Sequence, residues 1–147
     1  MYDTGDGVYK NKDKAAQWFE KSEQQEDADV QYDLGLLYSN GNGIVPRDTA
    51  KSMQWYEKAA QQGHPKAQNE VGKRYYNGIG VPEDKAKAAH WFEPAAQQGI
   101  AVAQYILGLM YLIGLGIPQD ETKAKELFQK AAEQGYKEAK EILRKDF

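Results

Sequence analysis

The amino-acid sequence predicts an all-α solenoid made of helix pairs that repeat about every 36 residues. Trp18, Trp55 and Trp91 lie 37 and 36 residues apart, and an aromatic residue follows each of them. A further step of 36 residues reaches Leu127 and Phe128. A fixed period in the range of roughly 20–50 residues indicates a solenoid, in which each unit buries its apolar face against its neighbours. Such proteins usually present an extended surface to a partner rather than a catalytic pocket.

The first helix of each pair is indicated by alanine, leucine and tyrosine residues that recur every three or four positions along one helical stripe. Each stripe contains a glycine, and a glycine inside a helix costs about 1 kcal/mol relative to alanine. Its presence at Gly35, Gly72 and Gly108 suggests that a neighbouring backbone or ring approaches closely at these positions. We expect the first helices near residues 28–40, 66–77 and 102–113.

The second helix of each pair follows a loop with strong stop signals. A Gly-x-Gly segment ends the first helix, because glycine adopts the left-handed conformation of a helix C-cap, and a proline follows in the loop. Asp48, Asp84 and Asp120 then stand where an N-cap accepts hydrogen bonds from free backbone N–H groups. The aromatic pair and two alanines form the expected packing face. We expect the second helices near residues 48–62, 84–98 and 120–134.

The two ends of the chain depart from this pattern. Tyr2 and the segment Gly5–Val8 match the end of a first helix whose beginning is missing, which indicates either a truncated unit or an irregular cap. The helix expected near residues 13–25 therefore lacks its partner. At the C-terminus Arg144 replaces the repeated glycine, as is typical of a capping helix. We predict one repeat domain over residues 1–147, with a partial repeat at 1–27, full repeats at 28–64, 65–100 and 101–136, and a capping helix at 137–147.

Pro94 lies inside one of the second helices, where the neighbouring repeats have Lys58 and Lys130. It removes the hydrogen bond to the carbonyl of His90, and an interior proline costs about 3 kcal/mol. We therefore expect a local kink. We favour a tolerated distortion over a re-aimed ligand surface, since a kink needs no function to persist.

Charge and composition argue against several classes of function. The net charge is −3 and the isoelectric point is about 5.5, so nothing draws the whole chain to nucleic acid or to an anionic membrane. The absence of cysteine excludes disulfides, cysteine-zinc sites and thiol nucleophiles. The longest apolar stretch, near residues 106–117, is interrupted by glycines and is too short to span a bilayer. The given start lacks a signal peptide, and the sequence leaves the compartment open: cytoplasmic as given, or periplasmic or secreted if a signal peptide lies upstream.

The repeated pattern resembles the Sel1-like repeat, a relative of the tetratricopeptide repeat with a longer loop between its helices. Its form is Ala-Gln-x-x-Leu-Gly-x-x-Tyr-x-x-Gly-x-Gly-Val-x-x-Asp-x-x-Lys-Ala-x-x-Trp-Tyr-x-Lys-Ala-Ala-x-x-Gly, and its three occurrences cover nearly the whole chain. The resemblance implies a right-handed superhelix, or α-solenoid, of antiparallel helix pairs that acts as an adaptor or scaffold. Members of that family take part in protein quality control, bacterial signalling and host interaction, and serve as immunity partners of secreted toxins.

We expect no catalytic, cofactor or metal site. The Gly-x-Gly loops close a helix, whereas a phosphate-binding loop opens one. His64 lies in a turn and His90 precedes Trp91; neither has a second ligand at metal-binding spacing, so a surface or packing role is favoured for both. The serines lack the sequence contexts of nucleophiles. The tryptophans are expected to be core residues, because they keep the register of the repeat.

The first helices supply the candidate binding surface. In tetratricopeptide-like repeats this helix lines the concave side, through positions three before and one, four and five after the central glycine. We therefore expect a protein or peptide partner, anchored by aromatic and polar side chains. The predicted surface consists of Tyr32, Leu36, Ser39 and Asn40, then Asn69, Lys73, Tyr76 and Asn77, then Tyr105, Leu109, Leu112 and Ile113.

The helix near residues 102–113 is apolar on nearly all sides and must be covered. Two explanations stay open, namely cover by the C-terminal helix with Phe147 and a hydrophobic patch for a partner or a dimer. The predicted function is a non-catalytic, monomeric interaction module without cofactors, such as a bacterial adaptor, an assembly partner or an immunity protein. One alternative is a hydrolase acting on a cell-wall or β-lactam-like ligand, which the resemblance suggests. Another is a structural protein with weak self-association.

Overall fold

The computed structural model describes Trp18, Lys21, residues 26–43 and residues 45–147, and this part of the chain contains helices and no strands. The expected helices from residue 28 onward are confirmed, because each boundary lies within one residue of its predicted position. The helix predicted near residues 13–25 lies outside the described residues, apart from Trp18 and Lys21. The described helices are α2 (Ala28–Asn40), α3 (Thr49–Gln61), α4 (Pro65–Asn77), α5 (Lys85–Gln97), α6 (Ala101–Ile113), α7 (Glu121–Glu133) and α8 (Lys137–Asp146).

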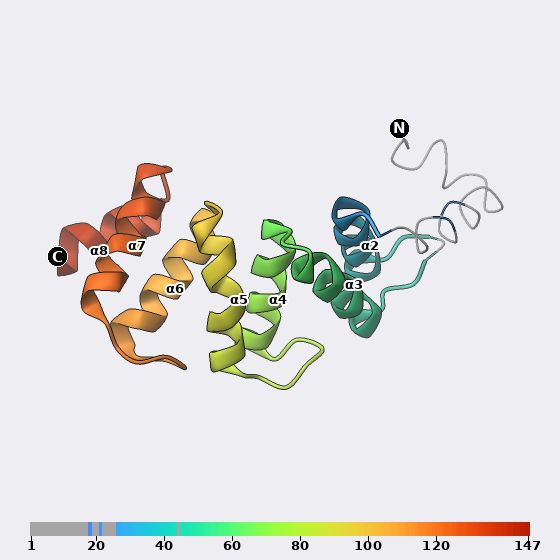
Figure 1. The fold of residues 1–147 in the computed structure, drawn as a ribbon, viewed down its shortest axis with the longest axis horizontal. Coiled ribbons are helices and arrows are strands. Elements are labelled where there is room, and N and C mark those ends of the chain that lie inside the picture. Colours follow the sequence, from blue (N-terminus) through green and yellow to red (C-terminus); the bar gives the residue numbers. More distant parts are fainter. Residues whose placement is uncertain (1–17, 19–20, 22–25, 44) are drawn as a thin grey trace.

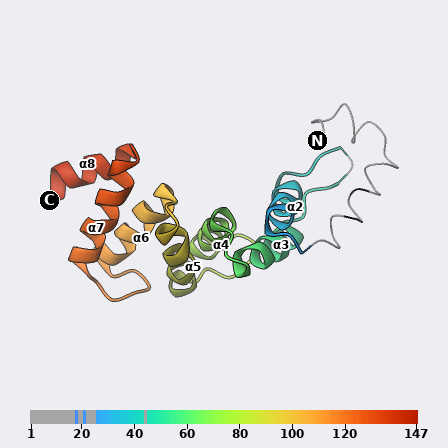
Figure 2. The same ribbon diagram turned by 45° about the horizontal axis from the view of Figure 1, so that its top comes forward.

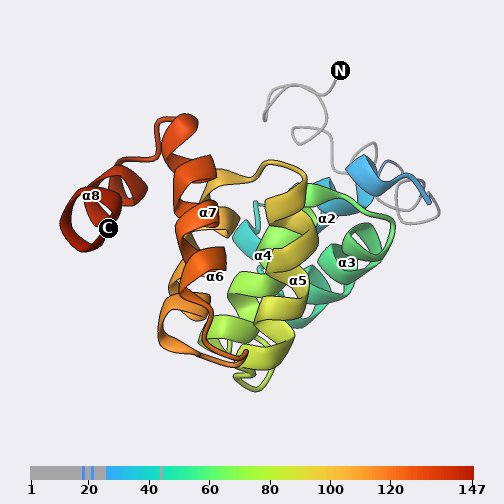
Figure 3. The ribbon, with the colours of Figure 1, turned by 60° about the vertical axis from the view of Figure 1, so that its left-hand side comes forward.

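The described helices stack in an elongated row with α2 and α8 at opposite ends (Figure 1). Each helix packs against the next one in the chain, so α2 with α3, α4 with α5 and α6 with α7 form successive pairs. Figure 2 shows these pairs following one another along the row, and Figure 3 shows α8 projecting beyond α7 at the C-terminal end. We call α2, α4 and α6 the first helices, and α3, α5 and α7 the second helices. The predicted all-α solenoid is therefore confirmed.

The glycine in the middle of each first helix makes room for a ring from the second helix. A Cβ atom added to Gly72 would lie 2.8 Å from Cδ1 of Phe92. At Gly108 the added atom would lie 2.6 Å from Cε1 of Phe128, and Gly35 is related in the same way to Tyr56. Real Cβ atoms essentially never approach a ring so closely, so the expected close approach at these glycines is confirmed.

In α3, α5 and α7 the most deeply buried ring is the one that follows Trp55, Trp91 and Leu127, respectively. Trp55 is buried, with 8 % of its surface exposed, so the core prediction holds for this residue. Trp18 and Trp91 are half-buried and pack at the edge of neighbouring clusters. The core prediction is therefore too strong for these two tryptophans. The rings that are fully buried are Tyr56, Phe92 and Phe128.

The predicted helix caps are present. Oδ1 of Asp84 accepts a hydrogen bond from the backbone N–H of Lys87 at 3.0 Å, and Asp48 and Asp120 cap α3 and α7 in the same way. Gly78 and Gly114 adopt the left-handed conformation at the ends of α4 and α6. These caps define where each helix begins and ends, and they explain why the boundaries follow the sequence signals so closely.

Helix α5 runs from Lys85 to Gln97 and includes Pro94. The N–H of Gln98 donates to the Pro94 carbonyl at 3.1 Å, so helical hydrogen bonding resumes after the proline. The expected kink at this position stays a prediction.

A glutamine pair links the first helix of each complete repeat to the end of its second helix. The Nε2 atom of Gln98 donates to Oε1 of Gln68 at 2.8 Å, and Gln134 donates to Gln104 at 3.0 Å. In the first complete unit, Gln62 donates to Gln31 at 2.7 Å. The acceptor glutamines of all three pairs are buried, so each bond satisfies a polar group inside the solenoid. These pairs therefore connect the two helices of each repeat, which apolar packing also holds together.

Candidate functional site

The first-helix surface begins at α2, where Tyr32 and Leu36 are half-buried and Asn40 is exposed. The Tyr32 ring stacks on His64 with 4.7 Å between ring centroids, and it lies 5.6 Å from the ring of Tyr56. Leu36 and Tyr32 both pack against the apolar cluster that contains Tyr56 and Val71. Part of this predicted surface therefore contributes to the contact between units, while its outer atoms stay accessible.

Helix α4 carries the most accessible polar part of the predicted surface. Asn77 is exposed, and its Nδ2 atom donates to the Lys73 carbonyl at 3.1 Å. The Lys73 side chain is 43 % exposed and lies 3.1 Å from the Glu70 carboxylate. Tyr76 is half-buried under the Lys85 ammonium group, which lies 3.7 Å from its ring centroid. Asn69 is only 7 % exposed, so its side chain is not offered to a partner in this structure.

Helix α6 presents the third part of the predicted surface to α8. Tyr105, Leu109 and Leu112 all pack against the cluster around Phe128, which also includes residues of α8. The ring centroids of Tyr105 and Phe128 lie 5.8 Å apart. The three residues therefore share an apolar cluster with α7 and α8 and remain half-buried, so both explanations left open by the sequence stay open. Ile113, at the end of α6, is 65 % exposed.

A buried arginine joins the first two complete units. Arg74 is 6 % exposed, and its Nη2 atom donates to the Oγ atoms of Ser39 and Ser52 at 3.1 and 3.2 Å. Its guanidinium carbon lies 5.1 Å from the Tyr56 ring centroid. Ser39, a predicted surface residue, is therefore held by a neighbouring unit.

Sequence reasoning did not single out the role of Arg74. The available signal was the repeat register, which places an arginine where the other first helices have Leu37 and Met110. The partner hydroxyl of Ser52 likewise stands where the other second helices have Ala88 and Ala124.

His64 occupies the N-terminus of α4 beside a shallow hollow that Tyr32 also lines. Its Nδ1 atom accepts from the N–H of Ala67 at 3.2 Å, and its Nε2 atom lies 3.0 Å from Oδ1 of Asp29. Burial is the main cause that raises the pKa of both Asp33 and Tyr32 at this hollow. The packing role expected for His64 is confirmed, because both ring nitrogens have structural partners.

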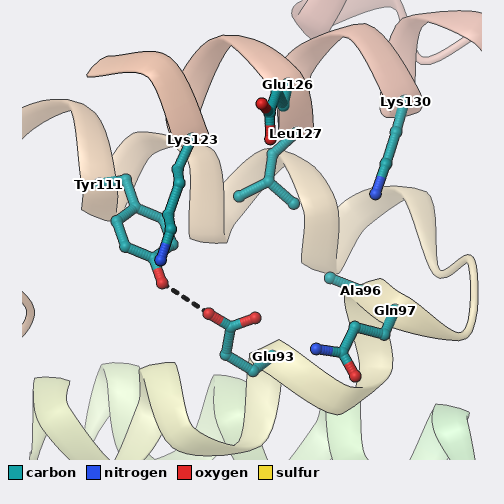
Figure 4. A pocket seen from close by; sticks show the side chains of 8 residues that line it. All are labelled: Glu93, Ala96, Gln97, Tyr111, Lys123, Glu126, Leu127 and Lys130. Carbon is teal, nitrogen blue, oxygen red and sulfur yellow. Dashed lines mark hydrogen bonds between the residues drawn. The ribbon is translucent and has the colours of Figure 1, made fainter. Parts of the chain in front are cut away.

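A second hollow, of about 250 Å³, lies between α5 and α7 (Figure 4). At its edge the Tyr111 hydroxyl donates to Oε1 of Glu93 at 2.6 Å, and the Lys123 ammonium lies 5.3 Å from the Tyr111 ring centroid. Burial and the bond to Glu93 raise the pKa of Tyr111 to about 12. Its phenol is therefore neutral near pH 7 and acts as a hydrogen-bond donor rather than as a base. Sequence reasoning did not identify this hollow.

The described residues give no indication of metal chemistry or of a membrane span. Within the described part of the chain, no group of three or more histidine, cysteine, aspartate or glutamate side chains is arranged to hold a metal ion. None of its helices combines the length and the apolar character that a bilayer span requires.

Comparisons with known proteins identify a repeat family. The family model of the Sel1 repeat matches residues 1–27, 28–64, 65–100 and 101–136. Among proteins with curated functions, none matches the chain significantly.

Three solved structures with the same fold, all from bacteria, resemble the chain. The chain resembles a Sel1 repeat protein from Oxalobacter formigenes with a TM-score of 0.80 and 35 % identity, over 88 % of this chain and 96 % of that one. It resembles c5321, a protective antigen of uropathogenic Escherichia coli with an SLR fold, with a TM-score of 0.72 and 38 % identity, over 85 % of this chain and 26 % of that one. Helicobacter pylori cysteine rich protein B matches with a TM-score of 0.67 and 27 % identity, over 94 % of this chain and 98 % of that one.

Proposed function

The chain belongs to the Sel1 repeat family, and we propose that it is a non-catalytic adaptor that binds a protein or peptide through the first-helix surface of its first two complete repeats. Sel1 repeats generally mediate protein–protein interaction. The proposal adds a location to that general role, and α2 and α4 provide the residues.

The observation that carries the proposal is the difference between α4 and α6. On α4, Lys73 and Asn77 leave polar atoms accessible beside the ring of Tyr76. On α6, the equivalent positions, Leu109 and Leu112 among them, pack with α8. A mixture of aromatic and polar side chains is typical of protein-binding surfaces, where rings anchor the partner and polar groups fix its register. The first two units therefore carry the polar part of the predicted surface, whereas the third part is apolar.

The hydrolase alternative has no support from the comparisons or from the described residues. The two ring nitrogens of His64 cap α4 and contact Asp29. His90 is exposed, and its ring lies 5.5 Å from that of Trp91. Neither arrangement places a histidine as the base of a nucleophile.

The test is quantitative affinity capture from cells that naturally make the protein. We compare the natural chain with a variant that carries Lys73→Glu and Asn77→Arg, which changes the charge of the α4 surface without removing an apolar contact. The matched control carries Lys140→Glu and Gln129→Arg, which make the same changes in charge at exposed positions of α8 and α7. Circular dichroism confirms that both variants are folded.

We expect a protein that the natural chain and the control retain to be lost from the α4 variant, by at least tenfold. Equal retention by all three chains would contradict the assignment of the surface. Loss from the control alone would move the site to the C-terminal end of the solenoid.

A further inference from the structure

The hollow between α5 and α7 lies where the third complete repeat lacks a ring that the other repeats possess. Trp91 of α5 packs back against the cluster around Tyr56 in the preceding unit. Leu127 of α7 has the same register and packs back against the cluster around Phe92. Leucine is smaller than tryptophan, and Leu127 and Ala96 line the hollow. The second complete repeat therefore keeps the receiving surface, with Phe92 and Ala96 where the first has Tyr56 and Ala60, while the third supplies a smaller side chain.

The same repeat also retains a lysine that covers such a ring elsewhere. In α3, the Lys58 ammonium lies 4.4 Å from the Trp55 ring centroid, three residues along the helix. Lys130 follows Leu127 at the same spacing and lines the hollow, with its ammonium directed toward α5 (Figure 4). A cation over the face of an indole ring is a favourable contact. In α7 the lysine is present and the ring is absent.

We propose that this hollow is a binding site for an aromatic side chain, a tryptophan presented by a protein partner. Leu127 and Ala96 provide its apolar floor, and Lys130 provides a cation for the ring face. Glu126 stands at the rim, where a carboxylate accepts the hydrogen bond that an indole N–H donates. Tryptophan is among the residues that most often anchor protein interfaces, because it has an apolar body with one polar atom.

This site is separate from the first-helix surface of α2 and α4. Seven of the eight side chains that line it belong to α5 or α7, and Tyr111 is the contribution of α6. The inference therefore goes beyond the proposed function and stands or fails independently of it.

The first experiment is a nuclear magnetic resonance titration of the isotope-labelled full chain with N-acetyl-L-tryptophanamide. N-acetyl-L-leucinamide is the matched probe without a ring. We expect saturable shifts for the backbone amides of Ala96, Gln97, Leu127 and Lys130, with the tryptophan probe binding at least severalfold more tightly. The absence of saturable shifts at these residues, or equal affinity for both probes, would overturn the proposal.

Two variants test the geometry. Leu127→Trp restores the ring found in the other repeats and fills the hollow from within, so we expect a folded chain whose affinity for the tryptophan probe falls by at least tenfold. Lys130→Gln removes the cation and is expected to weaken binding by roughly two- to fivefold. A folded Leu127→Trp chain with unchanged affinity for the tryptophan probe would contradict the proposal. If that chain does not fold, Ala96→Leu blocks the floor of the hollow instead. Unchanged affinity of this variant for the tryptophan probe would also contradict the proposal.

Discussion

Gly72 shows how single residues determine the packing of this solenoid. It lies in the middle of α4, where alanine would normally be the better helix former. The ring of Phe92 occupies the space in which a Cβ atom would lie. The absence of a side chain at Gly72 therefore lets α4 and α5 approach closely, and it explains the recurrence of glycine at the same place in each unit.

Gly72→Ala is expected to destabilise the fold by about 1–3 kcal/mol, because overpacking a well-filled core outweighs the gain in helix propensity. Chemical denaturation measures this change in the free energy of unfolding. The control is the double variant with Phe92→Leu, in which the smaller side chain relieves the contact. The double variant should lose less than the sum of the two single losses. A Gly72→Ala chain more stable than the natural one would contradict the packing described.

At the scale of the helices the sequence was most informative, because it predicted where each described helix begins and ends. Asp84 and Gly78 occur as local signals that need no knowledge of distant contacts, and the structure places both at helix ends. The deepest rings were harder to identify, because Trp91 and Phe92 are adjacent and only their three-dimensional neighbours distinguish them. Arg74 escaped notice for a related reason, since its partners Ser39 and Ser52 lie on two other helices.

The sequence predicted which repeat positions form the candidate binding surface, but not which of their side chains are accessible to solvent. Lys73 and Asn69 occupy equivalent kinds of position in the repeat pattern, yet only Lys73 offers its side chain to solvent. The hollow beside Leu127 lies at a contact between two units, where a leucine stands in place of the tryptophan of the other repeats. Sequence spacing alone does not report such a difference in side-chain volume.

Asp84→Ala is expected to destabilise the chain by about 1 kcal/mol, because the first turn of α5 loses the side-chain acceptor for the N–H of Lys87. Asp84→Asn keeps an acceptor oxygen and should lie close to the natural chain. Thermal and urea denaturation of the three chains provide the comparison. Equal losses for alanine and asparagine would show that the cap is not the source of the stabilisation.

On the scale of the whole molecule, α8 closes the C-terminal end of the described solenoid. Its residues Ile142 and Leu143 pack against the apolar cluster around Phe128, and Leu109 and Leu112 of α6 pack against the same cluster. Solenoid units bury their apolar faces on their neighbours, so a terminal unit needs a cover. Helix α8 provides that cover for the third complete repeat.

Deletion of residues 137–147 is expected to expose the apolar side of α6 and to cause association that increases with protein concentration. Light scattering over a concentration series measures the mass. Lys140→Ala, an exposed change on α8, is the control and should leave the mass unchanged. A truncated chain that stays monomeric at every concentration would show that the cover is dispensable.

The measurement that tests the central claim most directly is photo-crosslinking in cells that naturally make the protein. A photoreactive amino acid is placed at Asn77 on the α4 surface, or at Gln54, an exposed position of α3, and the adducts are identified by mass spectrometry. We predict that Asn77 yields an adduct with a specific protein and that Gln54 does not. A specific protein adduct from Gln54, with none from Asn77, would contradict binding through the first-helix surface.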